Sequence, residues 1–489
     1  MLFYFLSLLF GFLANAQDKR TNNWFFGAKQ GITFNTNPPS KLTDPRQNRF
    51  DESIATVSDK DGNLLFYTDG ESVWNNAHDR MPNGNGLNGF STTTQTLVVP
   101  IPDSEHLYYI FTASAQGGFF QSRPIGFYYS VVDMNLAGGL GDVITKNILL
   151  NHSTTEKIAA THHANGRDIW VMMHEWNNNV FKAYLLTPMG ISTEPVTTAI
   201  GSIHTGGLGG VLVENTNAIG QMKFSPNGNM LALCISRNLV VDFFHFDKGT
   251  GKLSNFVTFS IDEDLNKRIY GIEFSTDNKK VYISYFNQIP PVGTGSTIFY
   301  IIQFNLEEID FEKKELIIFE KKYNQATTVI GALQLASDGR IYCSHFLPDF
   351  FLFAIEQPNK SGFACQMNDT FLKMDDFIGL GLPNFVSSFL PNEDPDFRFP
   401  SREAILEMPN AFTPNGDGIN DSFVPIISEN ITFSTLSIYN RWGKLIFQKD
   451  KEIAWSGEKY PAGVYYYHIL YVGKDNQSKE AKGWLQMIK

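Results

Sequence analysis

The stretch Ser58-Asp59-Lys60-Asp61-Gly62-Asn63-Leu64-Leu65-Phe66-Tyr67-Thr68-Asp69 decides the fold of the first part of this chain. A polar turn with Asp-Gly at its centre leads directly into a run of apolar and aromatic side chains. Asp-Gly or Asn-Gly beside such a run is a strong hairpin signal, because both turn residues need positive φ. The stretch therefore predicts two antiparallel strands joined by a tight turn.

The same plan recurs five more times along the chain. Each copy has a polar turn followed by an apolar and aromatic strand, and the copies lie at 102–112, 164–173, 224–236, 274–286 and 336–346. The second turn residues stand at 62, 105, 166, 228, 278 and 339, so the repeat spacing is 43 to 62 residues. A four-stranded propeller blade takes about 40–50 residues. These repeats predict an all-β chain whose first domain, residues 17–390, is a β-propeller.

Six turns are visible, and about seven blades are expected. The extra blade would combine the start of the chain, from Trp24 to Phe34, with the segment from Phe377 to Leu390. Such a closure joins the ring by strand pairing and leaves no exposed sheet edge. The irregular spacing leaves six or eight blades open, and an array of β-sandwiches is the alternative fold.

The composition excludes several classes of protein. The chain has 489 residues, of which 18% are charged against a typical ~25%, and 42 are Phe. Such a chain is neither disordered nor a polyelectrolyte. Its net charge of −11 also argues against nucleic acid as a partner, because phosphate binding needs clustered Lys and Arg.

The N-terminus has the pattern of a signal peptide at residues 1–16. Leu2 to Leu13 is apolar apart from Ser7 and Gly11, and Ala14-Asn15-Ala16 follows. This run is too short to span about 30 Å of hydrocarbon as a helix, but it suits a signal-peptide core. We predict cleavage between Ala16 and Gln17. No other stretch approaches 18 apolar residues, so the mature chain is predicted to be exported and not membrane-spanning.

Three cysteines, Cys234, Cys343 and Cys365, are too few for a disulfide framework. Cys343 and Cys365 flank one apparent hairpin region and are the more plausible disulfide pair. Three separate buried thiols are the other interpretation.

A different module follows a short boundary segment. Residues 391–404 contain three prolines with acidic residues between them, which predicts a linker. Residues 405–489 carry as many basic as acidic side chains, so the net charge belongs to the part before them. Short strands are expected at 422–427, 432–440, 444–449, 463–472 and 483–488. Strands and turns of this spacing predict a small immunoglobulin-like β-sandwich.

The motifs of this module carry a family resemblance. They comprise Pro409, Asn410, Phe412, Thr413, Pro414, Asn415, Gly416, Asp417, Gly418, Asn420 and Asp421, then Tyr439, Asn440, Arg441, Trp442 and Gly443, and finally Gly463 and Tyr465. Together they resemble the gliding-motility-associated C-terminal domain, the type B sorting domain of the Bacteroidetes type IX secretion system. The resemblance implies recognition by the outer-membrane secretion machinery and delivery to the cell surface or the medium. The first part, notably residues 62–70 and 381–385, also resembles a region common in such secreted proteins, which implies a fold and no ligand.

The loop 415–421 offers closely spaced oxygen ligands of the kind that Ca²⁺ prefers. The candidate ligands are Asn415, Asp417, Asn420 and Asp421. The spacing lacks the bidentate Glu of an EF-hand. An Asx-turn loop, in which these side chains cap their own backbone, is the alternative. No other cofactor is predicted.

Catalytic motifs are absent from the sequence. His174-Glu175 lacks the second His of a zincin motif, and His162 and His163 point to opposite faces of any strand. No Gly-x-Ser-x-Gly elbow occurs. If the propeller were an enzyme acting on extracellular polysaccharide, its carboxylates and His would have to converge. Glu52, Asp69, His163 and Glu175 would be the first candidates.

The sequence therefore favours a binding protein over an enzyme. We expect an exported, adhesin-like propeller that binds a glycan or protein ligand through loops at one end of the ring. Trp74, Trp170 and Trp176 are candidate stacking platforms for sugar rings, although most aromatics of a propeller fill space between blades. A polysaccharide lyase or hydrolase and a structural component of the envelope or motility surface are the alternatives.

Overall fold

The computed structural model describes most of the chain, in two compact units. The described residues are 18–43, 50, 52–89, 96–115, 125–207, 215–261, 267–289, 295–308, 316–324, 329–347, 349–400, 406–427, 431–451, 454–473 and 478–489. The first unit ends at Arg398, without residues 307–309, and the second begins at Phe399. The predicted cleavage between Ala16 and Gln17 lies outside the described residues, and so do residues 401–404 of the predicted linker.

The first unit contains seven antiparallel sheets, numbered here first to seventh in chain order. The first three sheets are built from β1 (Asn23–Phe26), β2 (Gln30–Thr33) and β3 (Ser40–Thr43); β4 (Ala55–Ser58), β5 (Leu64–Thr68), β6 (Ser72–Asn75) and β7 (Arg80–Asn85); and β8 (Thr96–Pro100), β9 (Leu107–Ala113), β10 (Phe127–Asp133) and β11 (Asp142–Asn151). The fourth has five strands, β12 (Ile158–His162), β13 (Ile169–His174), β14 (Val180–Thr187), β15 (Gly190–Ile191) and β16 (Val196–Ala199).

The remaining three sheets of this unit have four strands each. They are β17 (Met222–Phe224), β18 (Met230–Ile235), β19 (Val240–Asp247) and β20 (Lys252–Ser260); β21 (Lys267–Phe274), β22 (Lys280–Ile289), β23 (Ser296–Asn305) and β24 (Leu316–Tyr323); and β25 (Ile330–Leu335), β26 (Ile341–His345), β27 (Phe351–Ile355) and β28 (Met367–Lys373). Helical structure in the described ranges is limited to short 3₁₀ turns at Ala137–Gly139, Thr216–Ala218, Gly362–Cys365 and Ser387–Phe389.

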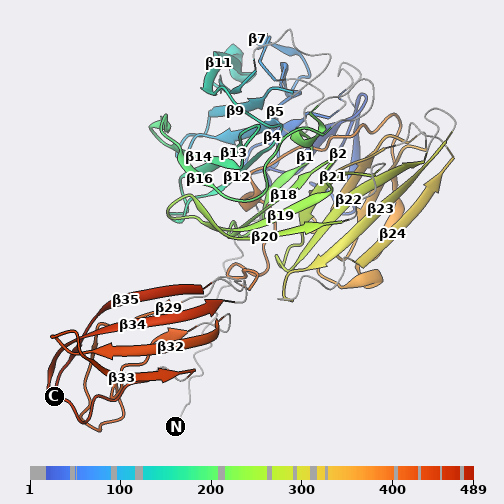
Figure 1. The fold of residues 1–489 in the computed structure, drawn as a ribbon. Coiled ribbons are helices and arrows are strands. Elements are labelled where there is room, and N and C mark those ends of the chain that lie inside the picture. The colour runs from blue at the N-terminus through green and yellow to red at the C-terminus, as the bar shows by residue number, and fades with distance from the viewer. Residues whose placement is uncertain are drawn as a thin grey trace, which may run out of the picture. The chain divides into compact units, whose positions relative to one another are not determined.

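The order of the strands makes this unit a seven-bladed β-propeller. Each sheet pairs consecutive strands, except that β16 of the fourth sheet pairs with β14, and Figure 1 shows the consecutive order for β21 to β24. The first strands of successive sheets, from β1 and β4 through to β25, contact one another and so form the inner ring. All six predicted turns join the first strand of a sheet to its second, which confirms the repeat. They therefore share one face of the ring, called the turn face below.

Aromatic side chains fill the space between neighbouring sheets. Phe66 of the second sheet meets Tyr108 of the third, with ring centroids 5.5 Å apart. Phe181 of the fourth sheet meets Phe244 of the fifth at 5.1 Å. The high Phe content thus serves the blade interfaces, where ring pairs add to the free energy gained by burial. The aromatic side chains Trp74 and Trp170, predicted as candidate sugar platforms, are buried in these cores.

The segment predicted to complete the extra blade lies beside the first sheet but adds no regular strand. Ala28 N and Gln30 Nε2 donate hydrogen bonds to Phe377 O at 2.9 and 2.8 Å. The first sheet keeps only β1, β2 and β3. A continuous ladder is missing because the chain turns away from the sheet and continues through the inner ring.

This segment, residues 380–386, touches the first strands of four different sheets. Leu380 O accepts from Ala332 N in β25, and Asn384 N donates to Ile54 O just before β4. Asn384 Oδ1 accepts from Lys223 Nζ of β17 at 3.1 Å, and Val386 bridges Ala160 of β12. Residues 380–386, called the central segment below, reach four inner strands and therefore occupy the centre of the ring.

Glycine is required where the central segment passes the second sheet. A Cβ atom at Gly381 would lie 1.7 Å from Glu52 O, so any larger residue would force the backbones apart.

Residues 391–398 of the predicted linker lie on the turn face, where we call them the strap. Asn227 Nδ2 donates to Phe397 O at 2.8 Å, and Asn229 Nδ2 donates to Pro395 O at 3.0 Å. Asn278 Nδ2 donates to Asp394 O at 2.8 Å. The strap therefore binds to the turns of the fifth and sixth sheets.

The second unit is a small sandwich-like β domain. Its main sheet has the order β30 (Ala411–Phe412), β35 (Ser478–Met487), β34 (Gly463–Gly473), β32 (Ile431–Tyr439) and β33 (Leu445–Asp450), and β29 (Leu406–Glu407) pairs with β31 (Ile426–Ile427). The strand expected at 422–427 is shorter than predicted, because Phe423 instead forms an isolated bridge with Trp455. Figure 1 shows β35, β34, β32 and β33 side by side.

The sequence left open whether Cys343 and Cys365 form a disulfide, and it predicted that the chain does not span a membrane. Cys234, Cys343 and Cys365 are free and buried, so the Cys343–Cys365 pairing is not formed. Within the described ranges, the helices are too short to cross a bilayer.

Candidate functional site

A depression of about 910 Å³ opens on the turn face of the propeller. Its walls come from the turns of the second, third and fourth sheets, with Arg20 from the N-terminal segment. The lining residues that carry the argument are Arg20, Lys60, Asp61, Asp103, Glu105 and Arg167. Turn residues reach this place because each blade presents its first turn at the same end of the ring.

Charged side chains of both signs meet in the depression. Arg167 lies 4.0 Å from Asp103 across the third and fourth sheets, and both side chains are more than half exposed. The bond from Arg167 to Asp168 raises the pKa of the guanidinium and lowers that of Asp168. Burial raises the pKa of Tyr108, at the edge of the depression, to about 12. The lining can therefore both donate and accept hydrogen bonds.

Residues 388 and 389, which follow the central segment, contact two residues that line the depression. Ser388 Oγ lies 2.7 Å from His162 Nδ1, and Arg20 lies over the Phe389 ring at 4.4 Å. Burial lowers the pKa of His162, so the imidazole is neutral near pH 7. The strap contacts the turns of the fifth and sixth sheets, whereas the depression is lined by the turns of the second, third and fourth sheets.

The four candidate residues for an enzyme do not converge. His163 lies in a β12–β13 turn on the turn face, where its ring packs near Trp170. Glu52 precedes β4, Asp69 follows β5 and Glu175 follows β13, so all three lie at the opposite end of their strands. The length of a strand separates His163 from the three carboxylates.

Asp69 and Glu175 have local structural partners. Asp69 Oδ1 accepts from the backbone N–H groups of Glu71 and Ser72 at 2.8 and 2.7 Å, and burial raises its pKa to about 6. Glu175 pairs with Lys182 at 2.7 Å. A turn cap and an ion pair explain these two carboxylates.

Sequence reasoning missed a buried pair of histidines on this side of the fourth sheet. His174 stacks on His204 with ring centroids 3.7 Å apart and an interplanar angle of 19°. The lone pair of an imidazole nitrogen lies in the plane of its ring. Because the two ring planes are nearly parallel, the lone pairs do not point to a common position, and the pair does not converge on one metal ion. Among the described residues no group of three His, Cys, Asp or Glu is placed to hold a metal. No repeat or spacing in the sequence links positions 174 and 204.

The motif residues of the second unit divide into buried and exposed sets. Phe412 and Tyr465 pack against Trp455 with centroid distances of 5.5 and 4.9 Å, and all three are buried. Asn440 Oδ1 accepts from the backbone N–H groups of Trp442 and Lys444, which closes the β32–β33 turn. Trp442 itself is 83% exposed. Most of the motif therefore builds the fold, and the Trp442 side chain lies on the surface.

In the loop predicted as a calcium site, carboxylate oxygens accept hydrogen bonds from the backbone of the loop itself. Asp421 Oδ1 accepts from the N–H groups of Asn415 and Gly416, and its Oδ2 accepts from Gly418 N at 2.8 Å. Asp417 Oδ1 accepts from Ile419 N at 2.8 Å. These backbone bonds lower the pKa of Asp421. The geometry is that of Asx turns, and calcium binding by Asn415, Asp417, Asn420 and Asp421 stays a prediction.

Residues 406–487 match the CHU_C Type IX secretion signal domain. This match confirms the resemblance and makes the protein one of the secreted or cell-surface proteins that use this route. Among curated proteins, none matches the chain.

Solved structures resemble the chain only distantly. A candidate 6-phosphogluconolactonase from Bacteroides uniformis has 13% identity and a TM-score of 0.44, over 74% of this chain and 99% of that chain. A protein from Lactobacillus plantarum has 12% identity and a TM-score of 0.41, over 74% and 98%. The periplasmic gluconolactonase of Pseudomonas aeruginosa has 10% identity and a TM-score of 0.36, over 95% and 96%. Similarity at this level assigns no activity to the chain.

Proposed function

We propose that the propeller is an adhesin-like binding module, carried to the cell surface or the medium by its C-terminal secretion domain. The depression on the turn face supports this proposal. It is concave, its walls come from three rigid sheets, and its volume lies in the range of known ligand pockets.

The lining indicates a polar ligand, either a glycan or a loop of a protein. Carboxylates of Asp61, Asp103 and Glu105 accept hydrogen bonds, while Lys60 and Arg167 donate them. Hydroxyl groups of a sugar need both kinds of partner, and so do the polar groups of a peptide. The scattered catalytic candidates give no comparable support to an enzyme.

A binding assay with product analysis tests the proposal. The chain from residue 17 is incubated with insoluble polysaccharides and with an array of immobilised peptides, and released oligosaccharides are measured in parallel. We expect retention on one of the two supports without release. The double variant K60A/D103A should bind at least about tenfold more weakly, because it removes one donor and one acceptor at the exposed lining.

The matched control is R80A/E194A, which removes one charge of each sign from exposed positions on the outer side of the second and fourth sheets. Its retention should equal that of the unmodified chain. Release of oligosaccharides would overturn the binding role in favour of an enzyme. Retention on neither support, or equal loss in both variants, would contradict a ligand site in the depression.

A further inference from the structure

The secretion domain has an open sheet face that its core does not use. Side chains alternate along β34 and β35, and Tyr465, Ile469, Leu485 and Met487 point into the core. The residues between them point the other way. Tyr466 is 48% exposed and Trp484 is 55% exposed on this second face.

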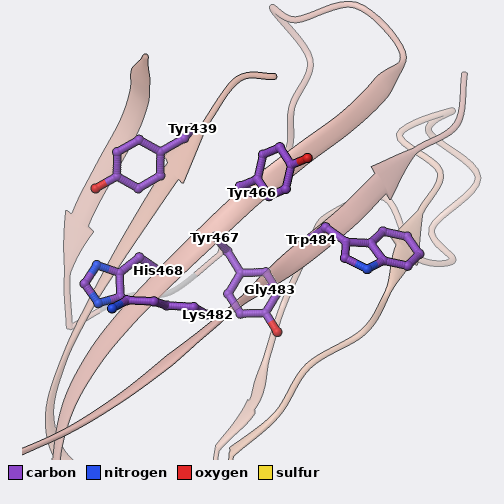
Figure 2. Close-up of a pocket in the computed structure, with 7 residues that line it drawn as sticks. All are labelled: Tyr439, Tyr466, Tyr467, His468, Lys482, Gly483 and Trp484. Atoms are coloured by element: carbon purple, nitrogen blue, oxygen red, sulfur yellow. The ribbon is translucent and has the colours of Figure 1, made fainter. Parts of the chain in front are cut away.

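Three aromatic side chains form a row across this face. Strand register pairs Tyr439 of β32 with Tyr466 of β34, and Tyr466 with Trp484 of β35. Figure 2 shows the three rings in that order across the three strands. Adjacent strands lie about 4.8 Å apart, so the row is a narrow apolar strip with a polar atom on each ring.

A second, polar row runs beside the first. His468 pairs in register with Lys482, two residues along each strand from Tyr466 and Trp484. His468 Nε2 lies 2.9 Å from Glu480 Oε2, and Lys482 Nζ donates to Glu480 Oε1 at 2.8 Å. Figure 2 shows the His468 ring and the Lys482 side chain next to each other, as their pairing in register requires.

The two rows enclose a trough of about 510 Å³. Its floor runs between them over Tyr467 and Gly483, and the Tyr467 side chain packs against the core on the other side of the sheet. A Cβ atom on Gly483 would lie 2.3 Å from the Tyr467 hydroxyl, so glycine lets that ring cross beneath the trough. The trough is therefore shaped by the sheet itself, rather than by a loop.

We propose that this trough binds a neutral saccharide. A pyranose ring offers a flat C–H face and a rim of hydroxyls, which match the aromatic row and the polar row respectively. The ammonium in the lining belongs to Lys482, and the carboxylate of Glu480 beside it carries a compensating negative charge, so the trough offers little net positive charge to an acidic ligand. The depression on the propeller differs in this respect, because its exposed lining is charged.

The ligand site on the secretion domain is independent of the one proposed on the propeller. The experiment uses the whole chain from residue 17, fluorescently labelled, on a printed array of neutral and acidic oligosaccharides. Calorimetry with the strongest neutral oligosaccharide follows. The variant Y466A/W484A should bind this oligosaccharide at least about tenfold more weakly, because both stacking surfaces are lost.

The matched control is W442A, which removes another exposed Trp of the same domain that lies in the β32–β33 turn outside the trough. Its affinity should stay within about twofold. Circular dichroism and thermal unfolding establish that each variant is folded.

Three outcomes would overturn the proposal. The first is a preference for acidic over neutral oligosaccharides. The second is binding that survives Y466A/W484A but is lost in K60A/D103A, which would assign the sugar to the propeller. The third is the absence of binding to neutral oligosaccharides. Failed export of folded Y466A/W484A from cells that express the whole chain would then make the row a contact for the secretion machinery.

Discussion

His174 and His204 are fully buried, and their rings stack on each other. We expect this buried contact to make the stability of the propeller depend on pH. Burial, and next the charge of Lys157, lowers the pKa of His174 to about 3. Burial and the neighbouring His174 lower the pKa of His204 well below its usual value. Lys157 itself is buried, and its Nζ donates to Ala218 O at 2.8 Å and Ile219 O at 2.9 Å.

We expect the propeller to lose stability as the pH falls below about 6.5. Below the unfolded pKa of about 6.5, the unfolded chain binds protons on both histidines, whereas the native state keeps both imidazoles neutral. Protonation therefore favours the unfolded state, and the free energy of unfolding falls as the pH falls. At pH 5 the loss for His174 is on the order of 2 kcal/mol. Thermal unfolding at pH 7 and pH 5 measures it. H204F should flatten the pH response, and H163Q, at a half-buried position on the turn face, should leave it unchanged; an equal response in both would contradict the assignment.

Trp455 and Trp442 separate the folding role of the C-terminal motifs from their exposed surface. Trp455 is 3% exposed in a cluster of aromatic rings, and Trp442 is 83% exposed. W455A should lower the free energy of unfolding of the second unit by about 3–5 kcal/mol, and W442A should change it by less than about 0.5 kcal/mol. Denaturant unfolding followed by circular dichroism of the chain measures both. Equal losses would show that Trp442 also supports the core.

At the scale of elements, the central segment and the strap perform the closure that propellers often achieve by strand pairing. Asn384 shows this role. Its Nδ2 donates to Ile158 O at 3.2 Å, and its Oδ1 accepts from Lys223, which is also 3.8 Å from Glu273. Both charged groups are buried, so each depends on the polar partners that the inner ring supplies.

Removal of the strap should destabilise the propeller even though the truncation removes no strand of the seven sheets. A chain ending at residue 390 loses the carbonyls that accept from Asn227, Asn229 and Asn278, and a chain ending at residue 400 keeps them. We expect the shorter chain to be less stable by about 2–4 kcal/mol, since each lost bond contributes about 0.5–1.5 kcal/mol. Chemical denaturation of the two truncated chains gives the difference. Identical midpoints would mean that residues 391–398 act as a plain linker.

At the scale of the whole molecule, the repeated turn sequences determined the all-β class, the propeller and the position of its turn face. They did so because an Asp-Gly or Asn-Gly turn beside an alternating strand is a local signal, readable within about ten residues. The C-terminal motifs likewise identified the secretion domain, since most of their residues are needed within that domain for turns and core packing.

Only the tertiary structure brought together the residues of the two proposed ligand sites. The path of residues 380–386 through the inner ring, the coverage of the fifth and sixth turns by the strap, and the row of Tyr439, Tyr466 and Trp484 all join residues far apart in the chain. Each depends on burial and pairing partners supplied by other strands, and no local pattern encodes those partners. The same holds for His174 and His204, whose contact exists only because the fold brings two segments of the chain together.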